Sequence, residues 1–287
     1  METNLRWVLI GALAPVLWGS VYFVTLRWLP ESVPLTAAML RALPAGLLLL
    51  LWGRRLPRGA WWWRSVVLGV LNCSAFFVLV YLAAKLLPTS VAAMIMSLSP
   101  VAIMLVAWAL VHERPQVRRL AGAALGVLGV AVLLGGASGA IDGWGVAASI
   151  AAMAMYALGS VLAKRWSGEV DDIALTGWQL TAGGLLLVPL ALAIEGPPVV
   201  PDVGALLGYA YIAVLPTAVA FVAWFGALRR LPAGQVGPLG LLNPVAGTVL
   251  GLLAGELLTP WQLIGIAVIL AGVLLGQVRS VRRSRRP

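Results

Sequence analysis

The sequence predicts an all-α integral membrane protein with ten transmembrane helices, arranged as two inverted five-helix repeats. Hydrophobic residues make up 61% of its 287 positions and charged residues only 10%, a composition that excludes soluble domains. A helix needs roughly 20 apolar residues to cross about 30 Å of hydrocarbon, and ten segments reach that length. They cover residues 7–28, 34–52, 63–84, 90–111, 117–136, 144–163, 173–194, 203–228, 235–255 and 261–278.

Two proline-centred stretches identify the repeat. Residues 98–101 read Leu-Ser-Pro-Val and residues 242–245 read Leu-Asn-Pro-Val, and the same offset separates the Leu-Pro pairs at 87–88 and 231–232. Each half therefore holds five spans, and this odd number makes the second half enter the membrane from the opposite side. The predicted halves are residues 1–137 and residues 138–287, the second ending in a basic cytoplasmic tail.

The repeated prolines, Pro100 and Pro244, are the expected bend points of the fourth and ninth spans. Proline inside a helix removes a backbone hydrogen bond and kinks the chain. Membrane proteins tolerate such a defect only where protein or a water-filled cavity covers it. We expect both prolines to lie beside a cavity and to act as hinges.

The basic residues follow a topological rule. The net charge is +10, and most Lys and Arg residues fall in the loops on the side of the amino terminus, so the positive-inside rule places both termini in the cytoplasm. Trp61, Trp62 and Trp63 fit an interfacial aromatic belt. The charge is thus explained without a nucleic-acid partner.

The sequence offers little for catalysis, so we do not expect an enzyme, a metal site or a cofactor. Acidic residues lie near span ends or in loops, and the only histidine, His112, falls in a cytoplasmic turn. A nucleophile with a base, paired carboxylates or metal ligands would be needed within the membrane. Glu113 and its repeat partner Glu256 are interpreted as polar helix ends, with a gating or assembly role as the alternative.

Arg41 stands out because it lies about seven residues, roughly 10 Å, into the second span and cannot shed its proton. A charge at that depth is costly and marks a candidate functional site. Arg41 could instead extend to the outer surface or bind backbone carbonyls of a bent neighbour. In a functional role it would hold a carboxylate, whose two oxygens match the guanidinium fork.

Other polar and aromatic side chains occur within eight of the ten spans, all except the fifth and the tenth. An apolar cavity with a few amides, hydroxyls and rings suits a modest amphipathic solute, although each single aromatic could serve only packing or lipid contact. The candidate substrate-binding residues are Trp18, Tyr22, Arg41, Asn72, Phe76, Ser97, Ser99, Tyr156, Ser160, Trp178, Gln179, Phe221, Trp224, Gln235 and Asn243. Proton coupling usually needs an intramembrane carboxylate or histidine, so we expect facilitated diffusion.

The fifth and tenth spans carry small residues at helical spacing, which allow membrane helices to approach closely. They are Gly122, Gly126 and Gly129 in one span, and Gly265, Ala271 and Gly272 in the other. We assign these faces to helix packing, with a homodimer through the two spans as one form of it.

In their order along the chain, several motifs resemble the EamA-type drug/metabolite transporter (DMT) superfamily. They are the Trp18-Gly19-Ser20 triplet, Arg41, the Pro100 and Pro244 spans, and the glutamates that follow them. The resemblance covers nearly the whole chain and implies export of amino acids and other small metabolites, with relatives that move nucleotide sugars, sugar phosphates or cationic drugs. Within the family the chain is most similar to YddG-type bacterial exporters of aromatic and other apolar amino acids, which implies the bacterial inner membrane.

The resulting hypothesis is an exporter of small amphipathic metabolites, best matched by amino acids, that works by alternating access. A phosphorylated substrate would require several basic residues along the path and a cationic drug a buried carboxylate. The spans supply only Arg41. Efflux of drugs or other metabolites stays open as an alternative, as does a non-transporting protein such as a lipid scramblase.

Overall fold

The computed structural model describes residues 2–29, 33–87, 89–135, 142–168, 170–198, 201–253 and 259–277. Within these residues, ten helical spans are long and apolar enough to cross a membrane, which confirms the predicted spans. Their order along the chain matches the predicted segments. The boundary proposed between residues 137 and 138 lies outside the described residues, as does Glu256.

Six of the described spans are continuous helices. They are α1 (Glu2–Trp28), α2 (Pro34–Gly53), α7 (Val117–Leu134), α8 (Gly143–Trp166), α9 (Asp172–Ile194) and α14 (Pro260–Gln277). Several begin with a clear local signal. Asp142 and Asp171 each accept a hydrogen bond from the backbone N–H three residues later, so they cap α8 and α9, and Asp202 caps the helix that begins at Val203 in the same way.

The other four described spans are interrupted. The third contains α3 (Trp61–Gly69), the π-helix η1 (Val70–Ser74) and α4 (Ala75–Leu86), and the fourth contains α5 (Thr89–Ser97) and α6 (Ser99–Val111). The eighth contains α10 (Val203–Ile212), the π-helix η2 (Ala213–Val219) and α11 (Ala220–Arg230). The ninth contains α12 (Ala233–Val236), the 3₁₀-helix η3 (Gly237–Leu241) and α13 (Leu242–Leu253).

The two repeated prolines start new helices. Pro100 lies in the first turn of α6 and Pro244 in the first turn of α13, where a missing N–H has no helical partner to lose. The expected cavity beside each proline stays a prediction. Pro100 is buried, and a Cβ on Gly237 of η3 would lie 3.2 Å from its Cα atom. Protein therefore covers this interruption.

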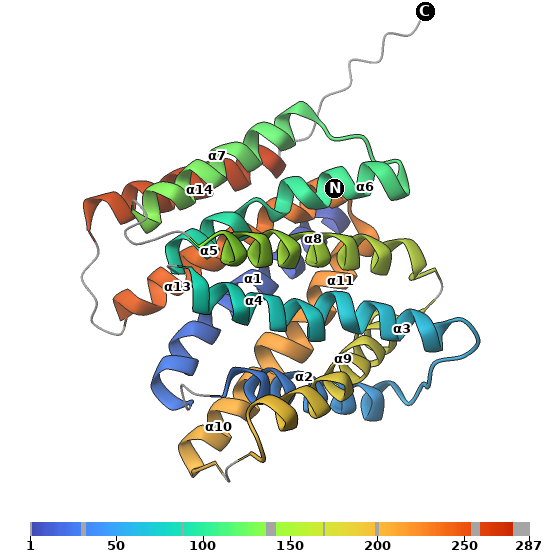
Figure 1. Ribbon diagram of the computed structural model, residues 1–287. Coiled ribbons are helices and arrows are strands. Elements are labelled where there is room, and N and C mark those ends of the chain that lie inside the picture. Colours follow the sequence, from blue (N-terminus) through green and yellow to red (C-terminus); the bar gives the residue numbers. More distant parts are fainter. Residues whose placement is uncertain are drawn as a thin grey trace, which may run out of the picture.

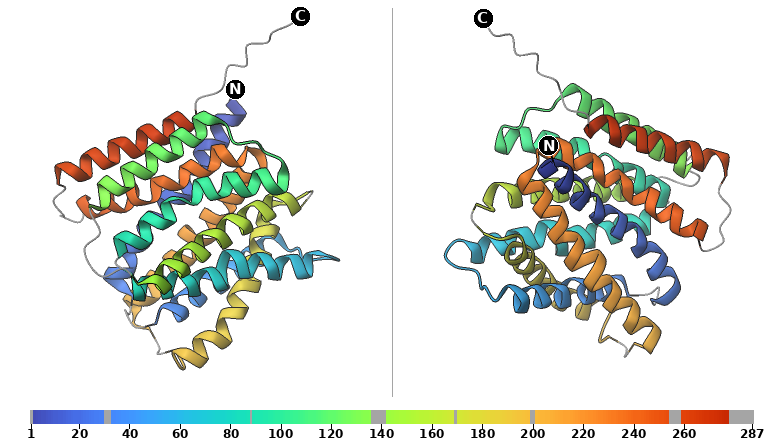
Figure 2. Two further views of the ribbon diagram at one scale, coloured as in Figure 1. Left: turned by 45° about the horizontal axis from the view of Figure 1, so that its top comes forward. Right: turned by 180° about the vertical axis from the view of Figure 1, so that it is seen from behind.

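Two helix pairs flank the molecule at opposite edges, α7 with α14 and α2 with α9 (Figures 1 and 2). Between them, α1 packs on α13 and α11, and α8 packs on α5, α6 and α4. The first span thus packs on the eighth and ninth, and the sixth span packs on the third and fourth. The two sets of contacts correspond when each span is matched with the one five places later. A twofold relation between the halves produces this pattern, and the inverted orientation stays a prediction.

The small residues of the fifth and tenth spans serve the contact between α7 and α14. A Cβ on Gly122 would lie 2.6 Å from the Gly272 carbonyl oxygen, and one on Gly129 would lie 2.6 Å from the Ile269 nitrogen. Only glycine permits so close an approach of two backbones. These faces pack against each other within one chain, and a homodimer through the two spans stays a prediction.

We predict that Gly272→Ala lowers the unfolding temperature of the purified protein. The added methyl group would lie 2.6 Å from both the Gly122 oxygen and the Gly126 nitrogen. Because both are backbone atoms, the helices must separate, and overpacking of this kind typically costs about 1–3 kcal/mol. Thermal unfolding in detergent measures the effect.

The matched control is Gly247→Ala in α13, where the nearest atom, the Gly19 oxygen, would be 3.6 Å away. Alanine favours the helix over glycine by about 1 kcal/mol, so this variant should match or exceed the wild type. Equal losses in the two variants would contradict the close contact.

Candidate functional site

Seven aromatic rings from four spans form a continuous cluster between the two halves. The Trp18 ring centre lies 5.6 Å from Phe221 and 5.3 Å from Trp224. From Trp224 the contacts continue to Tyr156 at 6.3 Å and from Tyr156 to Phe76 at 5.7 Å. Phe77 and Phe225 extend the two ends. We name this set the aromatic cluster; its members are Trp18, Phe76, Phe77, Tyr156, Phe221, Trp224 and Phe225.

The eighth span supplies one side of the site through a regular stripe. Thr217, Phe221 and Trp224 are spaced four and three residues apart, which aligns them on one helix face. Thr217 lies in the π-helix η2, a type of helix defect that is frequent at functional sites. Thr217 was not among the predicted site residues, although its place one turn before Phe221 was a usable signal.

Arg41 turns inward toward this stripe. Its Nε donates a hydrogen bond to the Thr217 hydroxyl at 3.2 Å, and its guanidinium carbon lies 5.0 Å from the centre of the Phe77 ring. A cation over an aromatic face is stabilised by the ring's quadrupole. The structure thus excludes the alternative in which Arg41 extends to the outer surface, and it places the guanidinium at one end of the aromatic cluster.

A buried amide pair lies behind the cluster. Asn72 in η1 donates through Nδ2 to Oε1 of Gln179 in α9 at 2.8 Å, and both side chains are almost fully buried. Oδ1 of Asn72 and Nε2 of Gln179 have no hydrogen-bond partner among the described residues. A Cβ on Gly159 would lie 2.3 Å from the Asn72 oxygen, so α8 needs glycine there to accommodate Asn72.

The predicted residues of the interrupted spans lie beside the breaks. The Ser97 hydroxyl donates to the Met94 carbonyl, one turn back in α5, while Ser99 begins α6. Asn243 lies in the first turn of α13, and its carbonyl oxygen would be 2.7 Å from a Cβ on Gly19. The absence of a Cβ at Gly19 thus lets α1 and α13 approach closely, directly beside Trp18.

Two predicted residues lie apart from the cluster. The Trp178 indole donates to the Arg55 carbonyl at 2.7 Å and its ring packs 5.4 Å from Trp61. Gln235, in α12, accepts a hydrogen bond from the Gln277 side chain through its backbone carbonyl. Both contacts connect helix ends, so we do not place these residues in the candidate site.

Two further predicted residues belong to α1 and α8. The side chain of Tyr22 lies outside the described residues. Ser160 is buried in α8, one turn after Tyr156. Whether any of the predicted residues binds substrate stays a prediction.

A polar clasp joins three segments at the predicted cytoplasmic end. Glu113 forms an ion pair with Lys164 at the end of α8. The Glu113 carboxylate also accepts the Ala233 N–H at 2.6 Å, and Lys164 donates to the Leu231 carbonyl at 2.7 Å. We name Glu113, Lys164, Leu231 and Ala233 the cytoplasmic clasp. The sequence did not predict the clasp, because Lys164 looks like any other basic residue at the end of a span.

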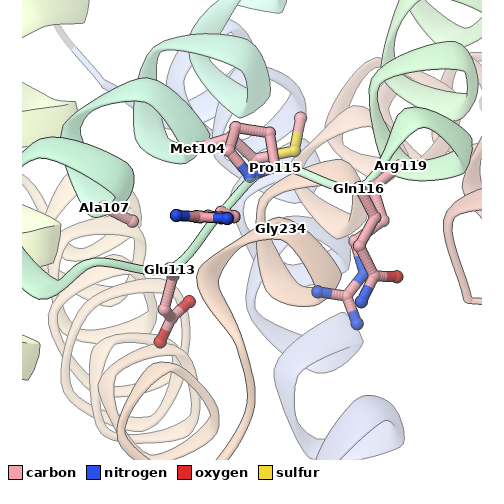
Figure 3. Close-up of a pocket in the computed structure, with 8 residues that line it drawn as sticks. Met104, Ala107, Glu113, Pro115, Gln116, Arg119 and Gly234 are labelled. Atoms are coloured by element: carbon pink, nitrogen blue, oxygen red, sulfur yellow. The ribbon is translucent and has the colours of Figure 1, made fainter.

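A small pocket adjoins the clasp. Figure 3 shows Glu113 and Arg119 near Gly234, the residue after Ala233. A Cβ on Gly234 would lie 3.0 Å from the Arg119 side chain and 3.1 Å from the Met104 sulfur. The first turn of α12 is therefore enclosed by the loop after α6 and by α7.

Burial differs between the two ends of the spans. At the predicted cytoplasmic end, most residues of α11 and η3 are buried. At the opposite end, Ala83 is the only buried residue of α4 and Gly251 the only one of α13, two helices described in full. Both helices still pack on neighbours, α4 on α8 and α13 on α1, but they are less buried than α11 and η3.

The fold and this interior define a class: a multi-pass membrane protein with a polar and aromatic site between its two halves. The profile of the EamA-like transporter family matches residues 5–135 and again residues 143–276. The chain belongs to this family.

Relatives of the same length support this membership. The chain is 35% identical over 276 residues to Protein PecM of Dickeya dadantii, which covers 95% of this chain and 93% of PecM. It is 30% identical over 238 residues to a probable terminal-alkyne amino-acid exporter of Streptantibioticus cattleyicolor, covering 81% and 79% of the two proteins.

More distant likenesses also extend over most of the chain. The uncharacterized inner membrane transporter YedA of Escherichia coli is 28% identical over 280 residues, or 93% of this chain and 90% of YedA. A crystal structure of a protein at 25% identity superimposes with a TM-score of 0.83 over 94% of this chain and 96% of the other.

We predict that the amide pair behaves as a unit. Gln179→Leu leaves the Asn72 donor buried without its acceptor, which should cost about 1–3 kcal/mol of unfolding free energy. Replacing both partners, as Asn72→Leu with Gln179→Leu, removes the unpaired groups and should restore most of that loss. Denaturant unfolding of Gln179→Leu, Asn72→Leu and the double variant measures the coupling. Losses that simply add in the double variant would contradict it.

Proposed function

We propose that this protein exports small amphipathic metabolites, with amino acids that carry aromatic or apolar side chains as the best-fitting class. The observation that carries the proposal is the aromatic cluster, placed between the halves with Arg41 at one end. Rings provide apolar contact area, and a guanidinium binds a carboxylate through two parallel hydrogen bonds. A molecule with a carboxylate next to an apolar body matches both.

The membership in the EamA-like family supports the transport part of this proposal. Two of the relatives are named as a probable amino-acid exporter and a probable amino-acid metabolite efflux pump. Another is named as an inner membrane transporter, in keeping with an inner-membrane location for this protein and with both termini in the cytoplasm.

Alternating access is the mechanism we infer. The cytoplasmic clasp and the buried α11 would hold the site closed toward the cytoplasm, while the less buried α4 and α13 would leave it open on the other side. Breaking the clasp and burying more of α4 and α13 would expose the site to the cytoplasm instead. The interrupted spans, with Pro100 and Pro244 at their restarts, are where we expect the bending.

The coupling we propose is facilitated diffusion, since Asp, Glu and His occur at span ends and in loops of the sequence. Counterflow of labelled phenylalanine into proteoliposomes tests transport, with and without an imposed pH gradient. We expect uptake that depends on the protein and is not stimulated by the gradient. Movement of labelled lipid without movement of any amino acid would contradict the proposal and favour a scramblase.

Replacing Arg41 should weaken carboxylate recognition. Arg41→Gln should raise the half-saturating phenylalanine concentration about tenfold or more, because a hydrogen bond to a charged group is worth about 1.5–3 kcal/mol. Arg41→Lys keeps the charge and loses the fork, so its effect should be intermediate. Competition by phenethylamine, which lacks the carboxylate, should be unaffected.

Arg27→Gln, at an exposed arginine near the end of α1, is the control and should leave both ligands unchanged. Equal weakening of phenylalanine and phenethylamine in Arg41→Gln would show that Arg41 acts on the fold and not on the carboxylate.

Removal of the clasp should open the cytoplasmic end. Cys73 is the only cysteine, so Cys73→Ala with Val236→Cys gives a single reporter at a fully buried position in α12. Lys164→Met leaves Glu113 without its cation. It should raise the rate of thiol labelling from the cytoplasmic side about fivefold or more, the range of typical coupling energies.

The control for this experiment is Lys85→Met. Lys85 lies over the Tyr81 ring near the end of α4, on the opposite side of the predicted membrane. The rate of thiol labelling in Lys85→Met should equal that of the reporter protein with an intact clasp. An unchanged rate in Lys164→Met would contradict a gating role for the clasp.

A further inference from the structure

Two indole N–H groups in the aromatic cluster are buried and have no acceptor. Nε1 of Trp18 and Nε1 of Trp224 make no hydrogen bond to any described residue, and Trp224 is only 1% exposed. An indole has one donor and nothing else to offer. A buried donor left unpaired costs about 1–3 kcal/mol. Two such donors next to each other therefore require an explanation.

The chain pairs another buried indole. Trp178 donates to the Arg55 carbonyl at 2.7 Å, and it lies outside the aromatic cluster, where it joins helix ends. Of these three buried indoles, the one outside the aromatic cluster has an acceptor, and the two inside it have none among the described residues. The two orphan donors also belong together, because their ring centres are 5.3 Å apart and come from opposite halves of the protein.

The orphan donors lie at the far end of the site from Arg41. Arg41 is bound to Thr217, and Trp224 follows Thr217 by seven residues along the same span, about 10 Å of helix. Phe221 lies between them and touches Trp18. The site thus has a cation at one end, rings in the middle and two N–H donors at the other end.

We propose that Trp18 and Trp224 bind a hydrogen-bond acceptor on the distal end of the substrate. This inference rests on the proposed function, in which Arg41 holds the carboxylate. The substrate class is then narrower: a carboxylate, an apolar body about the size of one aromatic ring, and a hydroxyl, carbonyl or similar acceptor at its tip. Such a group satisfies donors that an all-apolar side chain would leave buried and unpaired, which penalises the apolar analogue.

Tyrosine and 4-methylphenylalanine provide the test, because they share shape and carboxylate and differ in the distal acceptor. Binding of each to the full-length protein is measured by competition with labelled phenylalanine. We expect the wild type to prefer tyrosine about threefold to tenfold, the range of one neutral hydrogen bond. The preference should fall toward one in Trp224→Phe and in Trp18→Phe.

A second variant keeps the ring and removes only the donor. Incorporation of β-(3-benzothienyl)alanine at position 224 replaces the N–H by sulfur in a ring of nearly the same shape, so loss of the tyrosine preference there reports on the hydrogen bond. Trp108→Phe, at a half-exposed tryptophan of α6, is the control and should keep the preference.

The outcomes separate the two levels of the argument. Binding of both amino acids with no preference in the wild type, or with a preference that the benzothienyl variant retains, overturns the distal-acceptor inference and leaves the proposed function standing. Failure of the wild type to bind any amino acid contradicts the proposed function, and the inference falls with it.

Discussion

Inside the hydrocarbon of a membrane no water is available to pair a backbone N–H or C=O, and each unpaired group costs several kcal/mol. This constraint determines where the protein is irregular. Its helix interruptions occur in the third, fourth, eighth and ninth spans, which pack on α1, α2, α8 or α9. The paired helices at the two edges, α7 with α14 and α2 with α9, are continuous. Each interrupted span thus packs on a continuous helix.

Small residues make this interior possible because they let the irregular spans approach the straight ones. Gly19 of α1 faces the carbonyl of Asn243 at the start of α13, and the repeat-matched Gly159 of α8 faces the amide of Asn72. The same position in the two halves therefore serves two different contacts. One holds a restarted helix, and the other accommodates a buried side chain. A nearly symmetric scaffold becomes asymmetric at its centre in this way.

Composition and hydropathy were sufficient to predict the ten spans, because the length of apolar sequence needed to cross a membrane is fixed by the bilayer. The interruptions were predicted only where a motif marked them. Pro100 and Pro244 drew attention to the fourth and ninth spans, whereas η1 contains no proline and left no signal. The clasp was missed for a related reason, since its contacts join groups far apart in sequence. Lys164 binds Glu113 and the Leu231 carbonyl, and Glu113 also accepts the Ala233 N–H.

For the site, residue type alone identified Arg41 and most of the aromatic cluster, because charge and rings in mid-span are conspicuous. It could not separate Trp178, whose ring and N–H serve a helix junction, from Trp224, whose N–H has no acceptor among the described residues. That distinction depends on which backbone carbonyl folds into reach, and no periodicity encodes it. The glycine spacing of the fifth and tenth spans was enough to predict a packing role, and the structure shows that α7 and α14 pack on each other.

The most direct test of the account is to locate a bound substrate. Crystals of the protein with 4-bromophenylalanine would reveal the bromine through its anomalous scattering. We expect one peak within about 4 Å of the rings of the aromatic cluster, with the ligand carboxylate at Arg41. A peak elsewhere, such as in the open hollow lined by Leu134 and Trp261 where α7 ends and α14 begins, would contradict the assignment of the aromatic cluster as the transport site.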